Sequence, residues 1–143
     1  MPSPGVKARI DRFWRAIKRL EDLQLIDLKD FIKDENAIDA AERNLHVAIE
    51  AMIDICEALI SYMKWRTPRS YRDVGKILGD RGLLSHEEVV TFEEAVRLRN
   101  ILVHNYIYIS PHNVYKTIRE LRMSLVKIVS RVLDYMRTQN IDP

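Results

Sequence analysis

The chain has 143 residues, 47% of them hydrophobic and 31% charged, and this balance predicts a single folded domain over residues 1–143. A net charge of +2 does not by itself indicate a charged partner, and a single cysteine excludes an internal disulfide. No apolar run approaches the roughly 18 residues that a membrane-spanning helix needs. No charged-then-apolar leader opens the sequence, so we expect a cytoplasmic protein outside the membrane.

Four glycines and five prolines leave long uninterrupted stretches, and these favour helices. The first predicted helix covers residues 6–25, with apolar side chains on one side and basic side chains on the other. A polar connection over residues 27–36 follows. The second predicted helix, residues 37–65, is the longest, and its apolar residues recur at intervals of three and four. That spacing requires one side of the helix to face a core.

Capping signals predict three further helices. A signal at Ser70 begins a short third helix, which ends at the glycines of residues 79–82. A capping box at Ser85 begins a fourth helix, which we expect to end near Tyr106. Ser110 followed by proline begins the fifth. About five helices joined by short connections predict an all-α, up-and-down bundle.

The fourth predicted helix carries an arginine where an apolar side chain is expected. Arg99 lies in the middle of an apolar stripe that includes Phe92 and Val96. An unpaired buried charge is very costly, so its guanidinium must meet a carboxylate, a phosphate or water. Asn100 and His104 are four residues apart, so the amide can orient the imidazole. Arg99, Asn100 and His104 form a candidate catalytic site.

This set fits metal-free cleavage of RNA. A base removes the proton of the ribose 2′-hydroxyl, which attacks the adjacent phosphorus, while a cation stabilises the phosphorane and an acid protonates the leaving 5′-oxygen. His104 can make either proton transfer, and Arg99 can bind two phosphate oxygens. The sequence lacks metal-ligand spacing, so we expect no metal and no cofactor. The remaining histidines are expected at the surface or at helix caps: His46, His86 and His112.

The spacing of Arg99 and His104 raises a geometrical problem. Residues five apart on an ideal helix point about 140° apart, so one helix does not easily direct both at one phosphate. Either the helix unwinds just before His104, or a second subunit supplies the complementary group. We expect the second solution, a homodimer in which the segments from Arg99 to Tyr106 face each other across a twofold axis.

The segment from Lys64 to Arg81 concentrates positive charge. It holds six basic and two acidic residues, with Trp65 and Tyr71 between them. Such a segment suits phosphate contacts and base stacking. A solvated basic connector is the alternative. The candidate RNA-binding residues are Lys64, Arg66, Arg69 and Arg72.

The stretch from Arg99 to Tyr106 has the pattern R-x4-H-x-Y, with a polar residue after the arginine. It resembles the signature of the HEPN superfamily and, more closely, of the HepT toxins of MNT–HepT toxin–antitoxin pairs. The second predicted helix, the segments around Ser70 and Gly82 and the final helix also fall where that family has such features. The resemblance covers about residues 20–136 and implies a HEPN-like bundle. It also implies a toxin of a type VII-like system that acts as a metal-independent endoribonuclease, with paired motifs lining a cleft at a twofold interface.

The resemblance implies further roles. In HepT-like proteins the motif tyrosine receives AMP from the partner nucleotidyltransferase. The resemblance therefore implies that Tyr106 is the acceptor of AMP and that an MNT-type nucleotidyltransferase antitoxin is the partner. RNA is the implied substrate. In this context Glu50 and Asp54, on the polar side of the second helix, are candidates to support the Arg99 guanidinium.

Two other interpretations stay open. In one, the chain is a non-catalytic helical subunit of a minimal nucleotidyltransferase complex, in which Arg99 grips a nucleotide phosphate and His104 only forms a hydrogen bond. In the other, Arg99 forms a structural ion pair with Glu50 or Asp54. Activity with and without His104 separates the catalytic interpretation from both.

Overall fold

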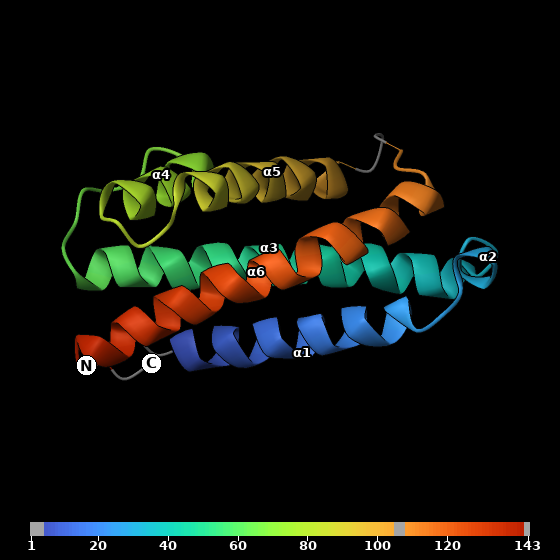
Figure 1. Cartoon of the computed structure of the whole chain (residues 1–143), viewed down its shortest axis with the longest axis horizontal. Helices are drawn as coiled ribbons and strands as arrows, with labels where there is room; N and C mark the ends of the chain where they lie inside the picture. Colours follow the sequence, from blue (N-terminus) through green and yellow to red (C-terminus); the bar gives the residue numbers. More distant parts are fainter. Residues whose placement is uncertain (1–4, 105–107, 142–143) are drawn as a thin grey trace.

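The computed structural model describes residues 5–104 and 108–141, and within these ranges the protein is built from six helices and contains no strand (Figure 1). They are α1 (Val6–Gln24), α2 (Leu28–Phe31), α3 (Glu35–Tyr62), α4 (Tyr71–Asp80), α5 (His86–Val103) and α6 (Pro111–Thr138). The predicted all-α bundle is confirmed, and the additional helix is α2, a single turn inside the polar connection. Within the described residues, no helix has the length and apolar character needed to cross a bilayer.

Helix α3 is the central element of the bundle. Figure 1 shows α1 on one side of α3 and the pair α4 and α5 on the other side, while α6 passes diagonally in front of α3. Helix α3 contacts all four of these helices. The core between them includes the fully buried side chains of Phe13, Leu20, Met52, Phe92 and Ile128. Between α1 and α5, α3 carries the polar residues His46, Glu50 and Asp54, which contact Arg99 of α5 or Arg9 of α1 directly or through Glu50.

The predicted helix starts are confirmed at three serines. The Ser70 hydroxyl accepts a hydrogen bond from the backbone N–H of Asp73, and the Ser110 hydroxyl accepts one from Asn113. At Ser85 both bonds of the capping box are present, because the Glu88 carboxylate also accepts from the serine N–H. Each cap satisfies donors that the first helical turn leaves unpaired.

Helix α5 ends at Val103, earlier than the sequence indicates. His104 has φ −90° and ψ 101°, so its backbone is extended and the residue lies outside the helix. The segment that follows is rich in β-branched and aromatic residues, which have lower helix propensity than the residues before it. The expectation that the helix continues to about Tyr106 is therefore wrong. Tyr106 itself lies outside the described residues.

Candidate active site

The guanidinium of Arg99, on α5, is held by three neighbouring groups. Its Nε donates to Oε1 of Glu50, on α3, at 2.7 Å, and its Nη2 forms an ion pair with the same oxygen. Its Nη1 donates to the side-chain oxygen of Asn100 at 3.1 Å. Its Cζ lies 5.1 Å from the centre of the Tyr71 ring, at the start of α4. Three helices thus fix the orientation of one guanidinium, which is 21% exposed.

Glu50 is ionised by this arrangement. Burial acts to raise its pKa, but the hydrogen bonds and charges of Arg99 and His46 outweigh burial, and the pKa lies below the usual carboxyl value. His46 lies one turn earlier on α3, with Nε2 3.3 Å from Oε1 of Glu50. An ionised Glu50 can therefore orient the guanidinium and the imidazole at the same time.

His46 and Tyr71 are site neighbours that sequence reasoning missed. His46 is 27% exposed and contacts Glu50, so it is more than the surface or capping residue expected from the sequence. The spacing of four residues between His46 and Glu50 was the available signal. The sequence indicates Tyr71 only as a base-stacking residue of the basic segment. Its contact with Arg99 joins residues 28 positions apart and left no local signal.

Asn100 and His104 lie on either side of the end of α5. The Asn100 oxygen accepts from Arg99, which places the amide beside the guanidinium. His104 is exposed, and its backbone N–H donates to the carbonyl of Ile101 at 3.2 Å. Because His104 is extended, the angle of about 140° that an ideal helix imposes does not apply to it. The chain departs from the helix just before His104, so no second subunit is needed to correct the angle.

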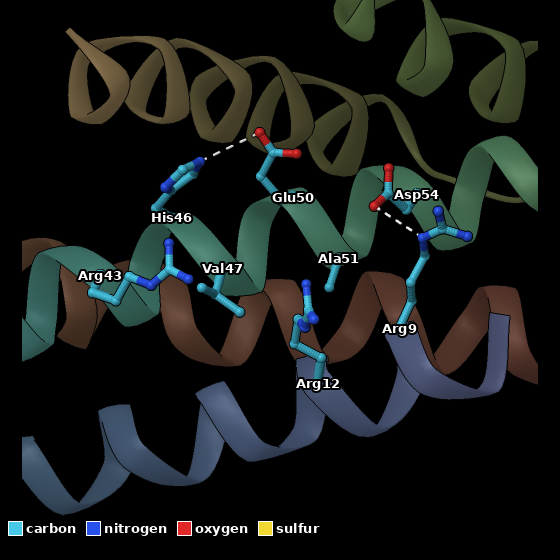
Figure 2. Close-up of a pocket in the computed structure, with 8 residues that line it drawn as sticks. All are labelled: Arg9, Arg12, Arg43, His46, Val47, Glu50, Ala51 and Asp54. Atoms are coloured by element: carbon cyan, nitrogen blue, oxygen red, sulfur yellow. Dashed lines mark hydrogen bonds and ion pairs between the residues drawn. The ribbon is translucent and has the colours of Figure 1, made fainter. Parts of the chain in front are cut away.

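Asp54 occupies a different position from Glu50. Its Oδ2 lies 3.2 Å from Nε of Arg9, on α1 (Figure 2). Burial raises the pKa of Asp54, and the charge of Arg9 offsets only part of this effect. Of the two candidate carboxylates, Glu50 is the one that bonds Arg99, while Asp54 joins α3 to α1.

The basic segment is partly engaged in its own structure. Arg66 donates two hydrogen bonds to Asp73, of 2.6 and 2.8 Å, and these lower the pKa of Asp73 well below its usual value. Trp65 is half-buried, with the Arg81 guanidinium 4.7 Å from its ring centre and the Tyr135 ring 6.0 Å away. Arg66 therefore stabilises the start of α4, and Trp65 is packed rather than presented to a base. The other three candidates are exposed: Lys64, Arg69 and Arg72.

The described residues offer little for metal binding or for redox chemistry. Within residues 5–104 and 108–141, no three His, Cys, Asp or Glu side chains form a group that could hold a metal ion. The thiol of Cys56 is fully buried, and burial raises its pKa far above the usual value, so it is an inert core residue. The polar chemistry of the site comes from Arg99, Glu50, His46 and His104.

Comparison with known proteins identifies the family. The Ribonuclease HepT-like family matches residues 14–132. The chain belongs to this family. Among related proteins, the tRNA nuclease HepT of Aphanizomenon flos-aquae is 26% identical over 135 residues, which cover 93% of this chain and 90% of that protein. The HepT resemblance read from the sequence is thereby confirmed.

Two solved structures share this HepT-like fold. The tri-AMPylated HEPN toxin of Shewanella oneidensis, in complex with an MNT antitoxin, has a TM-score of 0.81 at 24% identity, covering 90% of this chain and 96% of that one. The cytosolic protein YutE of Bacillus subtilis has a TM-score of 0.83 at 21% identity, covering 98% of this chain and 94% of that one. At these identities the likeness shows the HEPN fold.

Proposed function

We propose that this HepT-like protein is the toxin of a toxin–antitoxin pair and cleaves RNA without a metal ion. The observation that carries the proposal is the Arg99 guanidinium, held by Glu50, Asn100 and Tyr71 at the end of α5, immediately before His104. The family match and the related tRNA nuclease support the same activity.

Arg99 has the capacity to bind a phosphate in this position. A guanidinium has five N–H groups, and within the described residues three of them contact Glu50 or Asn100. One N–H remains on each terminal nitrogen, and this pair suits two non-bridging phosphate oxygens. The carboxylate of Glu50 fixes the plane of the fork, so Arg99 can stabilise the phosphorane without first being ordered.

His104 supplies the proton transfers in this proposal. It removes the proton of the ribose 2′-hydroxyl or protonates the leaving 5′-oxygen, and the products are a 2′,3′-cyclic phosphate and a 5′-hydroxyl end. The extended backbone of His104 frees its side chain from the direction that a continuing helix would impose. Asn100 acts as a positioning residue through its bond to Arg99.

An MNT-type nucleotidyltransferase is the proposed antitoxin, and Tyr106 is the proposed acceptor of AMP. The Shewanella oneidensis toxin of the same fold is AMPylated and bound to an MNT antitoxin, which supports this partner class. An AMP group on Tyr106 would add a negative phosphodiester and a bulky base two residues from His104. Arg99 could then bind that phosphate in place of the phosphate of RNA.

Cleavage of RNA in excess EDTA tests the proposal. The protein should cut single-stranded RNA, leave a 2′,3′-cyclic phosphate and spare DNA, which has no 2′-hydroxyl. His104→Ala or Arg99→Ala should each lower the rate by about 10²-fold or more. His86→Ala is the matched control, because His86 is an exposed histidine at the opposite end of α5. Activity that disappears with EDTA, or that survives in His104→Ala, contradicts the mechanism.

The Arg99–Glu50 ion pair is also the observation that favours a structural role for Arg99. In that case His104→Ala changes no activity, and Arg99→Ala lowers stability alone. A binding-only subunit would instead retain nucleotide or RNA binding and show no turnover in any variant. The same three measurements (stability, binding and turnover) therefore separate the interpretations.

A further inference from the structure

Two adjacent hollows lie between α1 and α3, and Figure 2 shows the residues that line the first of them. One part, of about 220 Å³, is lined by residues that include Arg9, Arg12, His46, Glu50 and Asp54. The second part, of about 200 Å³, shares Arg12, Arg43 and Val47 with the first, so the two hollows are adjacent. We refer to both together as the arginine groove.

The arginine groove carries acidic residues in its first part but not among the residues that line its second part. In the first part the two carboxylates are engaged, Asp54 with Arg9 and Glu50 with Arg99. In the second part no acidic residue is among those lining the hollow, although four arginines are: Arg12, Arg15, Arg19 and Arg43.

None of these four arginines forms an ion pair. This holds for Arg12, Arg15, Arg19 and Arg43 within the part of the chain that the structure describes. Four guanidinia around one hollow repel each other and create a strongly positive potential, which an anion relieves. This part of the arginine groove therefore favours the approach of an anion.

The shape of the positive region suits a chain of phosphates. Arg12, Arg15 and Arg19 recur at intervals of three and four on α1, so they follow one side of the helix over about 10 Å. A single phosphate spans only part of that length, whereas a nucleic-acid backbone follows it. The residues lining the two hollows include no Phe, Tyr or Trp, and His46 carries the one ring among them, so we expect contacts with phosphates more than with stacked bases.

The arginine groove also leads to the candidate active site. Glu50 lines the groove and bonds Arg99, and His46 lines the groove and contacts Glu50. We propose that the arginine groove binds the phosphodiester backbone of the RNA substrate outside the cleaved bond. This inference rests on the proposed ribonuclease function and adds a sequence-independent contact to it.

Binding of RNA to a non-cleaving protein tests the inference. In a His104→Ala background, the double variant Arg15→Gln/Arg19→Gln is compared with Lys7→Gln/Lys18→Gln. Both pairs lie on α1, all four side chains are exposed, and both variants lose two charges, but neither lysine lines the groove. The probe is a fluorescein-labelled single-stranded RNA of about 20 nucleotides, followed by anisotropy over a range of salt concentrations.

The groove variant should bind RNA on the order of tenfold more weakly than the lysine control. The slope of log K against log salt should fall by about 1.4, because each phosphate contact to a single strand contributes about 0.7. The control should keep the parent's slope. Circular dichroism should show both variants folded, because the substituted side chains are exposed. Equal RNA binding by the two double variants overturns the inference.

Turnover separates this inference from the proposed function. With His104 intact, the groove variant should raise KM for the long RNA and cleave a dinucleotide substrate, too short to reach the groove, at the parent's rate. If RNA binding depends on the groove but the parent protein cleaves nothing, the groove inference stands and the ribonuclease proposal fails. If the groove variant binds RNA normally and loses only the nucleotidyltransferase, the groove is a protein-docking surface and the inference is overturned.

Discussion

Glu50 fixes the orientation of the Arg99 guanidinium, but its negative charge offsets part of the positive charge of that guanidinium. A carboxylate beside a guanidinium weakens its attraction for phosphate, so the ion pair is useful only if orientation matters more than net charge. Glu50 bonds Nε and Nη2 on one side of the guanidinium, and the other side of the fork points away from the carboxylate. This arrangement makes Glu50 a positioning residue in the proposed reaction.

Replacing Glu50 with glutamine should lower stability in a pH-dependent manner. The pKa of Glu50 is lowered in the folded protein, so its contribution is present above the unfolded carboxyl pKa of about 4.3 and is lost as pH falls through the folded value. Glu50→Gln should therefore reduce the unfolding free energy by about 1 kcal/mol near neutral pH. The difference from the parent should disappear in acid. Urea denaturation at a series of pH values measures both quantities.

Glu57, two turns further along α3, provides a control of opposite sign. Burial and the nearby charge of Asp54 raise its pKa, so the ionised form is unfavourable in the folded protein. The contribution of Glu57 to stability therefore improves as pH falls through its folded pKa. Glu57→Gln should not destabilise the protein near neutral pH. If both variants respond to pH in the same direction, the assignment of the Glu50–Arg99 pair is contradicted.

We expect Tyr106 to be the residue that receives AMP. Co-expression with an MNT-type nucleotidyltransferase and ATP should add AMP to the chain, and peptide mapping by mass spectrometry should locate the AMP at Tyr106. The modified protein should lose RNA binding and turnover without unfolding, because the added phosphodiester competes for Arg99. Tyr106→Phe should remain active and escape neutralisation. A Tyr106→Phe protein that the transferase still neutralises through AMP transfer would refute the assignment.

At the scale of elements, α4 and α5 approach each other through two glycines. A Cβ at Gly75 would lie 2.6 Å from Cδ1 of Phe92, and one at Gly79 would lie 2.6 Å from Cγ2 of Val89. Both distances are shorter than non-bonded carbon atoms allow. The close packing places Tyr71, at the start of α4, against Arg99 near the end of α5. The α4–α5 contact is therefore part of the support of the site.

Substitution of Gly75 by alanine should separate these helices. Alanine improves helix propensity by about 1 kcal/mol, but the Phe92 ring is fully buried and has no room to retreat. We expect a net loss of about 1–3 kcal/mol of stability and a lower rate of RNA cleavage. Thermal unfolding and the cleavage assay measure the two effects.

Lys76→Ala is the matched control for Gly75→Ala, because Lys76 is the next residue of α4 and is exposed. It should change the unfolding free energy by less than about 0.5 kcal/mol. Gly79→Ala should lie between the two, because Val89 is only half-buried and can move. Unchanged stability of Gly75→Ala would show that α4 and α5 adjust to each other freely.

For the molecule as a whole, a homodimer is no longer needed to bring Arg99 and His104 together. A second subunit was expected to correct the angle between Arg99 and His104 on one helix, but His104 lies outside α5. The resemblance to HEPN proteins remains as support for the homodimer, whereas the apolar residues Phe92 and Val96 of the stripe around Arg99 are already buried within the protomer. Val103, the last residue of α5, is 40% exposed and next to His104.

The homodimer stays a prediction that light scattering can test. We expect a dimer at micromolar concentration, and we expect Val103→Asp to weaken it, because a twofold interface would place this charge in an apolar contact twice. Val90→Asp is the matched control, since Val90 is a valine with 41% exposure about 20 Å away along the same helix. A monomeric parent protein, or equal effects of the two variants, would contradict a dimer through this surface.

Most helix positions and the motif around Arg99 could be predicted from local patterns in the sequence. Serine caps at residues 70, 85 and 110 act on backbone groups within three residues, and apolar spacing of three and four reports which side of a helix is buried. Both signals are local, so helix positions and an all-α bundle could be predicted. Arg99 stood out for the same reason, as a charge on an apolar stripe.

Contacts between side chains of different helices depend on how the helices pack. Arg99 pairs with Glu50, 49 residues earlier, and not with Asp54, although the two carboxylates are one turn apart on α3. That choice depends on how α3 rotates between α1 and α5, which no local pattern specifies. The arginine groove has the same origin, because Arg43 on α3 joins the arginines of α1 only when the helices pack. The end of α5 at Val103 could not be predicted from the sequence either, because the last turn of a helix depends on small energy differences that local propensity does not resolve.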